Sequence, residues 1–390
     1  MSTGSTSPPR PPPTAKSCCA NNCEASFLAA NVASRSQEPH PKNPSDSVIP
    51  IQNLYYLLCY AWNRLPEREE LLSVQAAPFH KPLELLTQVL LSGTRRLLRQ
   101  GLGQAYVEQE EELPELRGRL LLAPSLSRDL LRRGRAVCAY DALTANTPFN
   151  GLLLGVLEQL GRTRRLAPAL RHEVRAVCRR FPASVAATPC TTHALRQVRR
   201  RRPHGQEAFL LNICTLLHQS ALPAPDAAGR SRFRDFRRDE RLMAQLFEAF
   251  VRNFYRHEQR RFRVLSETIT WQADAEQATD LALLPVMITD TTLEAPDRKI
   301  ILDTKYYKEA LRPRYDQQKL ISPHLYQLYA YLQNQPVAPG QQLEGILLYP
   351  AARHELAARY TLGGHPVRVV TIDLNQPWPG IAHDLLALVR

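Results

Sequence analysis

The chain has 390 residues, of which 44% are hydrophobic, so we expect two or three globular domains of usual size. Its 50 lysines and arginines against 37 acids give a formal net charge of +13, which suits a polyanionic partner such as nucleic acid. No apolar run is long enough to span a membrane and no signal-peptide core is present, so we expect a cytoplasmic protein with no membrane association. The eight cysteines include no C-x-x-C pair, which argues against a disulfide framework and a zinc site.

The N-terminal half combines an extension without periodicity and a mixed region. Residues 1–47 are rich in Pro, Ser, Asn and Thr, and we predict that they are disordered. Apolar residues then recur at helical spacing in four segments: 49–65, 83–101, 150–166 and 171–181. Residues 105–122 predict short strands around a proline turn. We therefore predict a mixed α+β domain over residues 48–205.

An arginine run stands near the end of this region, in the sequence LRQVRRRRPHG. Its five arginines precede Pro203: Arg196, Arg199, Arg200, Arg201 and Arg202. Such a run is compatible with a solvated charged surface and with contacts to phosphates, and the sequence leaves both open.

Residues 206–390 predict an α/β domain. A helix begins at Asp239 and carries Leu242, Leu246, Phe250 and Phe254 on one face. Three strands follow, at 263–271, 283–293 and 299–307. The remaining elements are a helix over 322–334 capped by Ser322, strands over 343–350 and 366–374, and a closing helix over 379–390. This order of elements is typical of an α/β fold.

An acid and a base stand two positions apart at the end of the third strand, in KIILDTKYY. Asp303 and Lys305 project to the same side of a strand as Ile301, while neighbouring residues occupy the other side. An ordinary ion pair at a half-exposed strand end would explain these two residues alone.

A second acid changes this interpretation. Pro296 and Asp297 fit the centre of a turn; because Pro296 cannot adopt a positive φ, we exclude a type I′ turn and expect a loop slightly longer than two residues. A hairpin symmetric about them places Asp290 opposite Asp303, with Cβ atoms about 5 Å apart. Two facing carboxylates repel, and Mg²⁺ would resolve the repulsion, with Lys305 beside it. Asp280 is a weaker alternative partner for Asp303.

Asp290 followed by Asp303-Thr304-Lys305 matches the D…(D/E)-x-K pattern of the PD-(D/E)XK nucleases, although Thr289 replaces the usual proline. More widely, the chain from residue 49 to 390 resembles McrC, the nuclease subunit of the McrBC 5-methylcytosine-dependent restriction system. The matching segments, in the same order, include IPIQNLYYLLCYAWN, YDALTANTPFN, FRDFRRDERLMAQLFEAF, LYQLYAYL and TIDLNQPWP.

The resemblance implies a restriction-endonuclease-like fold for the C-terminal domain and roles for four residues. It assigns metal ligation to Asp290 and Asp303, catalytic charge to Lys305, and a place in the active site to Gln327, for which a hydrogen bond along its own helix is the alternative. Glu248 stands where many relatives keep an acid on the first helix, and we interpret it as a partly exposed structural residue.

The resemblance also implies partners. The chain has no G-x-x-x-x-G-K-[ST] motif, so a separate AAA+ GTPase hexamer like McrB would hydrolyse the nucleotide. Residues 48–205 would dock on that ring and stimulate it, and the substrate would be double-stranded DNA containing modified cytosine. Two alternatives remain open: a stand-alone PD-(D/E)XK DNA-repair nuclease, and a non-catalytic adaptor that activates an AAA+ ring.

Overall fold

The computed structural model describes residues 49–65, 81–220, 235–306, 311–314, 317–351 and 355–390. The extension predicted at 1–47 lies outside the described residues. Ser45–Arg390 forms one compact unit. None of the described helices is long and apolar enough to cross a membrane.

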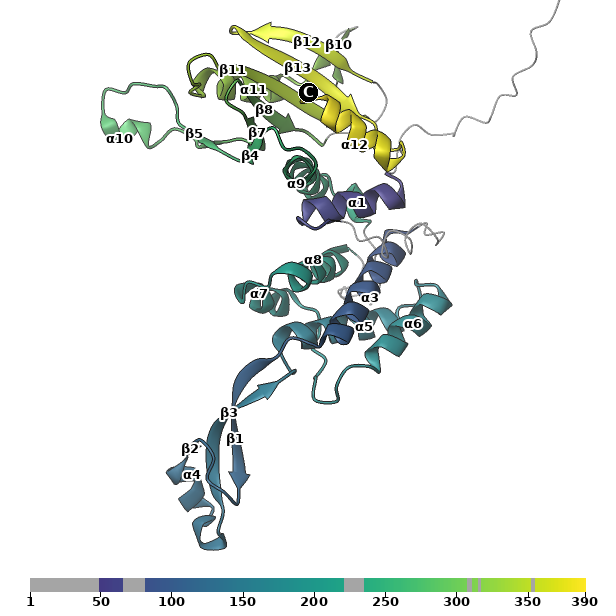
Figure 1. The fold of residues 1–390 in the computed structure, drawn as a ribbon, viewed down its shortest axis with the longest axis vertical. Helices are drawn as coiled ribbons and strands as arrows, with labels where there is room; N and C mark the ends of the chain where they lie inside the picture. Colours follow the sequence, from purple (N-terminus) through teal and green to yellow (C-terminus); the bar gives the residue numbers. More distant parts are fainter. Residues whose placement is uncertain (1–48, 66–80, 221–234, 307–310, 315–316, 352–354) are drawn as a thin grey trace, which may run out of the picture. The chain divides into compact units, whose positions relative to one another are not determined.

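A mixed six-stranded sheet organises the C-terminal half, with strand order β12-β13-β11-β8-β7-β4 (Figure 1). Its strands are β4 (Arg263–Leu265), β7 (Thr291–Glu294), β8 (Arg298–Thr304), β11 (Gln342–Pro350), β12 (Ala357–Leu362) and β13 (His365–Ile372). β11 runs parallel to both β8 and β13, and the other pairings are antiparallel. The α/β class predicted from the element order is confirmed.

In the described part of the C-terminal half, four short strands lie outside this sheet, in two ribbons. β5 (Thr268–Ile269) pairs with β6 (Met287–Ile288), and β9 (Leu311–Arg314) pairs with β10 (Gln317–Leu320). The first two predicted strands are therefore each divided in two, because β4 and β7 join the large sheet while β5 and β6 leave it. β9, β10 and β12 were not predicted.

Helices cover both faces of the large sheet. Ile300 and Leu302 of β8 belong to the same core cluster as Phe250 of α9 (Glu240–Glu258). Ile301 belongs to a second cluster with Leu328 of α11 (Ser322–Asn334). The alternation predicted for this strand is confirmed, and it places the even and odd positions of β8 against different helices.

The N-cap residues of these helices differ from each other. The Asp239 side chain accepts a hydrogen bond from the Leu242 amide and so begins α9. In α11 the N-cap residue is Ile321 and Ser322 is already helical, without a side-chain cap. The prediction that Ser322 caps this helix was wrong: the helix begins one residue earlier, and Pro323 lies in its first turn, where a backbone N–H donor is not needed.

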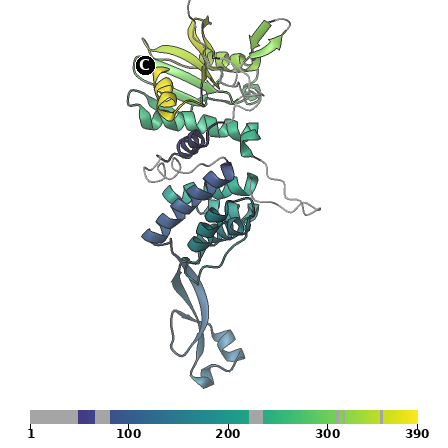
Figure 2. The same ribbon diagram turned by 90° about the vertical axis from the view of Figure 1, so that its right-hand side faces the viewer.

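α1 (Ile51–Ala61) packs against α9 although some 180 residues separate them in sequence (Figure 2). The Tyr56 ring stacks on Trp378, the first residue of α12 (Trp378–Ala387), with ring centroids 4.2 Å apart. The Asn53 side-chain amide donates to the carbonyls of Leu374 and Gln376 at 2.8 Å. Asn253 of α9 donates to the Tyr60 carbonyl at 2.9 Å. α1 is thus part of the core around the large sheet.

Five helices form a second layer of helix-on-helix packing. They are α3 (Pro82–Gln100), α5 (Pro148–Arg162), α6 (Pro168–Cys178), α7 (Thr192–Arg200) and α8 (Gly205–Ser220). α5 contacts α6, α7 and α8, and α3 contacts α6 and α8. The domain boundary predicted between residues 205 and 206 stays a prediction; α8, which follows it, packs on α3 and α5, which precede it.

A three-stranded antiparallel sheet with order β1-β3-β2 interrupts these helices in sequence. It contains β1 (Ala105–Leu113), β2 (Arg119–Leu120) and β3 (Ala136–Thr144), together with the short helices α4 (Leu122–Ser127) and η1 (Leu131–Arg133). Most β1 side chains are exposed, whereas the first half of β3 is buried. The strands predicted in 105–122 are confirmed, and β3 was not foreseen.

Candidate active site

The hairpin between β7 and β8 has the predicted register. Thr291 pairs with Leu302 and Glu294 pairs with Lys299, so the same register places Asp290 opposite Asp303. Ala295 and Arg298 exchange both backbone hydrogen bonds, at 2.9 and 3.3 Å, which leaves a loop of two residues. Neither loop residue has a positive φ, so the exclusion of a type I′ turn holds, but the expectation of a longer loop was wrong. A two-residue turn with negative φ values accommodates Pro296.

Asp290 directly precedes β7. Its carboxylate is held by Thr304, the residue between Asp303 and Lys305. Its Oδ2 accepts hydrogen bonds from the backbone amide and the hydroxyl of Thr304, both at 2.8 Å. Thr304 is the variable position of the D-x-K pattern, and here both of its donors orient the first acid. These two hydrogen bonds therefore join the start of β7 to the end of β8.

Asp303 is completely buried. Its Oδ2 lies 2.6 Å from the Lys305 ammonium, and its Oδ1 has no hydrogen-bond partner among the described residues. Burial, reinforced by the nearby negative charge of Asp290, raises the pKa of Asp303 to about 7. A buried carboxylate oxygen without a donor is costly unless a cation or a donor from outside completes it.

Lys305 lies beside Asp303 and is only partly buried, with 13% of its side chain exposed. Burial by itself would lower the pKa of this lysine, but the charges of Asp303 and Asp290 and the contact with Asp303 outweigh it, so the pKa is raised overall. Lys305 is therefore an ammonium ion at neutral pH. It can stabilise negative charge but is not suited to remove a proton.

Gln327 reaches the site through a neighbour on α11. Its side-chain amide donates to the Tyr331 hydroxyl at 2.6 Å, and that hydroxyl donates to the Ile288 carbonyl at 2.9 Å. The pKa of Tyr331 is raised, chiefly by burial and also by the charges of Asp303 and Asp290. The hydrogen bond along α11, which was the alternative role for Gln327, is thus present. Its acceptor, Tyr331, lies close enough to Asp303 and Asp290 to be affected by their charges.

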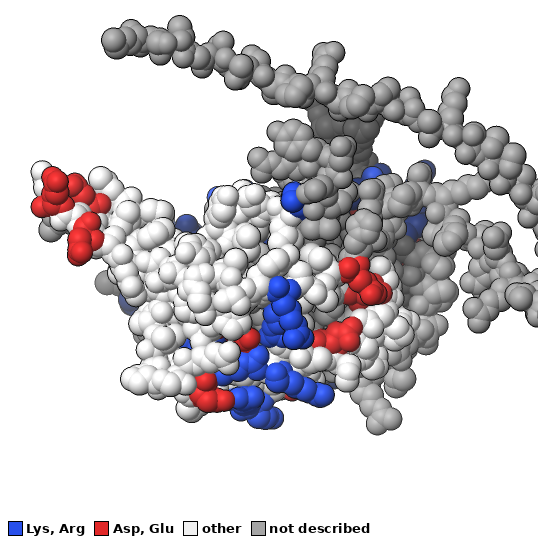
Figure 3. Space-filling view, turned by 90° about the horizontal axis from the view of Figure 1, so that it is seen from above, with Lys and Arg blue, Asp and Glu red and all other residues white. Residues whose placement is uncertain are grey.

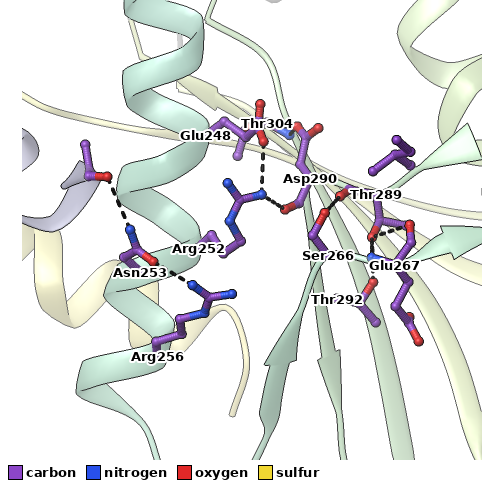
Figure 4. A network of polar contacts seen from close by, with 12 residues as sticks. Glu248, Arg252, Asn253, Arg256, Ser266, Glu267, Thr289, Asp290, Thr292 and Thr304 are labelled. Atoms are coloured by element: carbon purple, nitrogen blue, oxygen red, sulfur yellow. Dashed lines mark hydrogen bonds and ion pairs between the residues drawn. The ribbon is translucent and has the colours of Figure 1, made fainter. Parts of the chain in front are cut away.

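Glu248 and Arg252, one turn apart on α9, flank Asp290 from the other side (Figure 4). Arg252 Nη1 donates to Glu248 Oε1 at 3.0 Å and to the Asp290 backbone carbonyl at 2.8 Å. Burial and the charge of Asp290 raise the pKa of Glu248. Glu248, interpreted as structural, therefore lies at the site. Arg252 was missed, although its spacing of four residues from Glu248 is the signal of a helical ion pair.

Thr289, in place of the usual proline, is itself a hydrogen-bonding residue (Figure 4). Its hydroxyl accepts from the Glu267 amide at 2.9 Å and contacts the Thr292 hydroxyl at 2.9 Å. Its carbonyl accepts from the Ser266 hydroxyl at 2.7 Å. These bonds fix the residue before Asp290 to the segment between β4 and β5. The rival acid, Asp280, is an exposed residue of α10 (Ala278–Leu281).

The carboxylates fit a hard divalent cation in part. Asp290 and Asp303 carry oxygen atoms of the kind that such a cation prefers, and Asp303 Oδ1 has no described donor to compete with a cation. Within the described residues no group of three His, Cys, Asp or Glu side chains is arranged to hold a metal. The donors thus suit an ion that keeps several waters, as Mg²⁺ does, better than a fully caged ion.

The fold and the site define an α/β protein with two carboxylates and a partly buried lysine at the end of a sheet strand. A sequence profile described as "McrBC 5-methylcytosine restriction system component" matches residues 34–350. The "Type IV methyl-directed restriction enzyme EcoKMcrBC" of Escherichia coli K12 is 31% identical over 341 residues, which cover 87% of this chain and 97% of that protein. The chain therefore belongs to the McrBC family of restriction-system components.

A solved structure has a related fold. It is described as a half-complex from a tetradecameric assembly of Thermococcus gammatolerans McrB AAA+ hexamers with bound McrC. The match has a TM-score of 0.54 and 15% sequence identity, and covers 89% of this chain and 78% of that chain. At this identity the similarity concerns the fold alone.

Proposed function

We propose that this chain is the Mg²⁺-dependent endonuclease subunit of a restriction complex that acts on DNA containing modified cytosine. The large sheet with α9 and α11 would then be a restriction-endonuclease-like domain of the PD-(D/E)XK type. One observation carries the proposal: the buried Asp303, with an oxygen that lacks a described donor, faces Asp290 and contacts Lys305. Family membership and the E. coli relative support the restriction role.

Each site residue has a separate task in this proposal. Asp290 and Asp303 would hold the ion, which when bound would activate water and neutralise charge on the scissile phosphate. Lys305, kept protonated by the acids, would stabilise the negative charge that develops on the phosphate. Thr304 and Arg252 orient Asp290, and Gln327 orients the Tyr331 hydroxyl.

The nucleotide-hydrolysing partner would be an AAA+ GTPase hexamer like McrB, because this chain lacks a P-loop motif. We assign docking on that ring to residues 48–205. The three-stranded sheet and its short helices favour this assignment, because they expose large apolar side chains in a region where β1 is already an edge strand. The most exposed are Tyr106 (73%), Leu116 (72%), Leu126 (63%) and Leu122 (56%).

A cleavage assay with purified proteins tests the function. Methylated and unmodified plasmids are incubated with the chain, with and without an McrB-like partner, in GTP, ATP or no nucleotide. We expect efficient cutting only of methylated DNA, and only with partner, GTP and Mg²⁺ together. The Asp303→Asn variant should assemble with the partner and stimulate its GTPase without cutting.

Other outcomes would select an alternative. Methylation-selective cutting by the chain alone, without nucleotide, would favour a stand-alone nuclease. GTPase stimulation without any cutting by the wild-type complex would favour a non-catalytic adaptor.

A further inference from the structure

The positive charge of this protein is concentrated in one segment. Residues 159–206 contain twelve arginines, no lysine and one acid, Glu173, so their formal charge is +11 of the +13 of the whole chain. This segment contains α6, α7 and the turn after α5. A charge excess distributed only for solubility would not be confined to one eighth of the chain.

α7 presents the densest part of this charge. Ala194, Leu195 and Val198 are buried on the side of α7 that packs against α5 and α8. The other side and the residues after the helix carry five exposed arginines, which we name the α7 arginine ridge: Arg196, Arg199, Arg200, Arg201 and Arg202. The amphipathic pattern of α7 thus fixes the helix and leaves the arginines on the surface.

The ridge is not neutralised within the described part of the chain. None of its arginines forms an ion pair with a described carboxylate; Arg199 donates a hydrogen bond to the Thr215 hydroxyl, at 3.4 Å. By contrast, Arg95 pairs with Glu173 at 2.7 Å, and Arg162 pairs with Glu158 at 3.2 Å. Basic and acidic side chains also lie side by side on the face shown in Figure 3. The dipole of a helix favours one or two cations at its C-terminus, but it does not account for five arginines without an ion pair.

The ridge also lacks the apolar centre that a protein interface requires. Among the described residues, no large hydrophobic side chain between Ala145 and Asp280 is exposed, whereas the three-stranded sheet region exposes seven. Stable protein interfaces surround an apolar and aromatic core with a polar rim. Arginines without such a core match a repeating anionic surface, and guanidinium groups bind phosphates with paired donors.

We propose that the α7 arginine ridge binds the phosphate backbone of double-stranded DNA outside the catalytic site, without reading its sequence. This inference deepens the proposed function and rests on DNA being the substrate. The ridge would raise the affinity of the chain for DNA, while the choice of the methylated site would belong to the partner.

The test compares two variants with equal charge loss. The ridge variant replaces Arg196, Arg199, Arg200 and Arg201 with glutamine. The control variant replaces four exposed arginines of the three-stranded sheet region with glutamine: Arg119, Arg132, Arg133 and Arg135. Binding of the full chain to unmodified duplex DNA is measured by fluorescence anisotropy at several salt concentrations, without partner. Thermal unfolding of each variant checks folding, which exposed positions should preserve.

Each phosphate contact contributes about 0.9 to the slope of log affinity against log salt. We expect the slope for the ridge variant to be shallower by roughly 3. Its affinity for DNA at roughly 0.1 M salt should be at least about tenfold lower than that of the wild type. The control variant should bind like wild type. A folded ridge variant with wild-type affinity and slope, or a loss no larger than that of the control, would overturn the proposal.

Two further measurements separate this proposal from the proposed function. If the ridge variant binds DNA normally but no longer binds the McrB-like ring, the ridge is a protein-docking surface and the proposal fails. Cleavage by the ridge variant with partner should recover at low salt and high DNA concentration, whereas Asp303→Asn should bind DNA and never cut. If even the wild-type complex does not cut, the nuclease assignment fails while the anisotropy comparison still decides the ridge.

Discussion

The two larger sheets of this protein use their side chains in opposite ways. In the six-stranded sheet, all but the first residue of β8 and all but the end residues of β11 are buried. In the three-stranded sheet, six consecutive residues of β1 are exposed, and that strand lies at the sheet edge. One sheet is enclosed between helices, while the other leaves side chains and backbone groups available to a partner.

This difference explains where each kind of chemistry is located. A carboxylate is desolvated where other elements cover it, and Asp303 is buried at the end of β8, the strand packed between α9 and α11. An edge strand that carries Glu108, Glu110 and Glu111 is protected by charge against uncontrolled pairing, yet the apolar residues beside it can still be covered by a suitable surface. The predictions below test whether the enclosed sheet holds catalysis and the open sheet holds assembly.

The largest effect is expected in the enclosed sheet, from Asp303→Asn. An amide of similar size keeps the packing but supplies no charge for a cation, so DNA cleavage should fall by about a thousandfold or more. The measurement is the initial rate of plasmid cutting with partner, GTP and Mg²⁺. Asp297→Asn, in the exposed turn of the same hairpin, is the matched control and should cut normally. Cleavage by folded Asp303→Asn at near wild-type rate would remove Asp303 from the active site.

The open sheet predicts the opposite pattern. Replacing Leu116, Leu122 and Leu126 with serine should weaken binding to the McrB-like ring by roughly ten- to a hundredfold, because exposed leucines that become buried on docking contribute to affinity. Thermal stability should not change, since all three are exposed in this chain. Binding is measured by calorimetry with the hexamer assembled in a non-hydrolysable GTP analogue.

A matched control replaces Leu281, Leu283 and Leu284, exposed residues at and after α10, with serine. It removes the same number of exposed leucines from another part of the molecule. Equal losses of ring affinity in the two variants would contradict the assignment of docking to the three-stranded sheet.

Much of the enclosed sheet could be predicted from the sequence, because its signals are local. The alternation in KIILDT defines the two faces of β8, and the turn at Pro296 fixes the register that brings Asp290 to Asp303. These features depend on neighbours within about 15 residues. The positions of α9 and α11 followed from periodicity for the same reason.

Other features depend on contacts that a local pattern does not contain. The hydrogen bond from Arg252 to the Asp290 carbonyl joins residues 38 positions apart, and the packing of α1 on α9 joins residues almost 200 apart. β3 was missed because its buried residues complete a sheet with β1 across a long connection. The length of the turn at Pro296 was mistaken because excluding a type I′ turn does not exclude other two-residue turns.

Arg252 links α9 to the first acid, and its loss should have a moderate effect. In Arg252→Met the Asp290 backbone and Glu248 both lose a donor, so Asp290 should hold the ion less well. We expect the Mg²⁺ concentration for half-maximal cleavage to rise by roughly tenfold, with a smaller change in rate at saturating Mg²⁺. Arg252→Lys should recover only part of this, because an ammonium does not reproduce the planar fork.

Arg256→Met, one turn further along α9, is the control, since Arg256 bonds Asn253 rather than the site. It should leave the Mg²⁺ dependence unchanged. A purely structural role of Arg252 would lower thermal stability without moving the Mg²⁺ midpoint, and that result would contradict the positioning role.

The smallest effect concerns stability in the absence of metal. The pKa of Asp303 is about 7 in the folded chain, against an ordinary value of 3.8. Between these values the folded state keeps a proton that the unfolded state releases, so the free energy of unfolding should fall as pH rises from about 4 to about 7. Asp303→Asn lacks this group, so the wild type should lose stability relative to it as the pH rises through that window.

Chemical unfolding of both proteins in a chelator, at several pH values, measures this difference. The enclosed sheet is the reason for the effect, because Asp303 is completely buried and beside Asp290. Adding Mg²⁺ at pH 8 should restore stability to the wild type and not to Asp303→Asn, since an ion bound only by the folded carboxylates stabilises that state. Parallel pH profiles for the wild type and Asp303→Asn would show that water reaches the carboxylate. That result would contradict the claim that the six-stranded sheet encloses Asp303, on which the contrast between the two sheets depends.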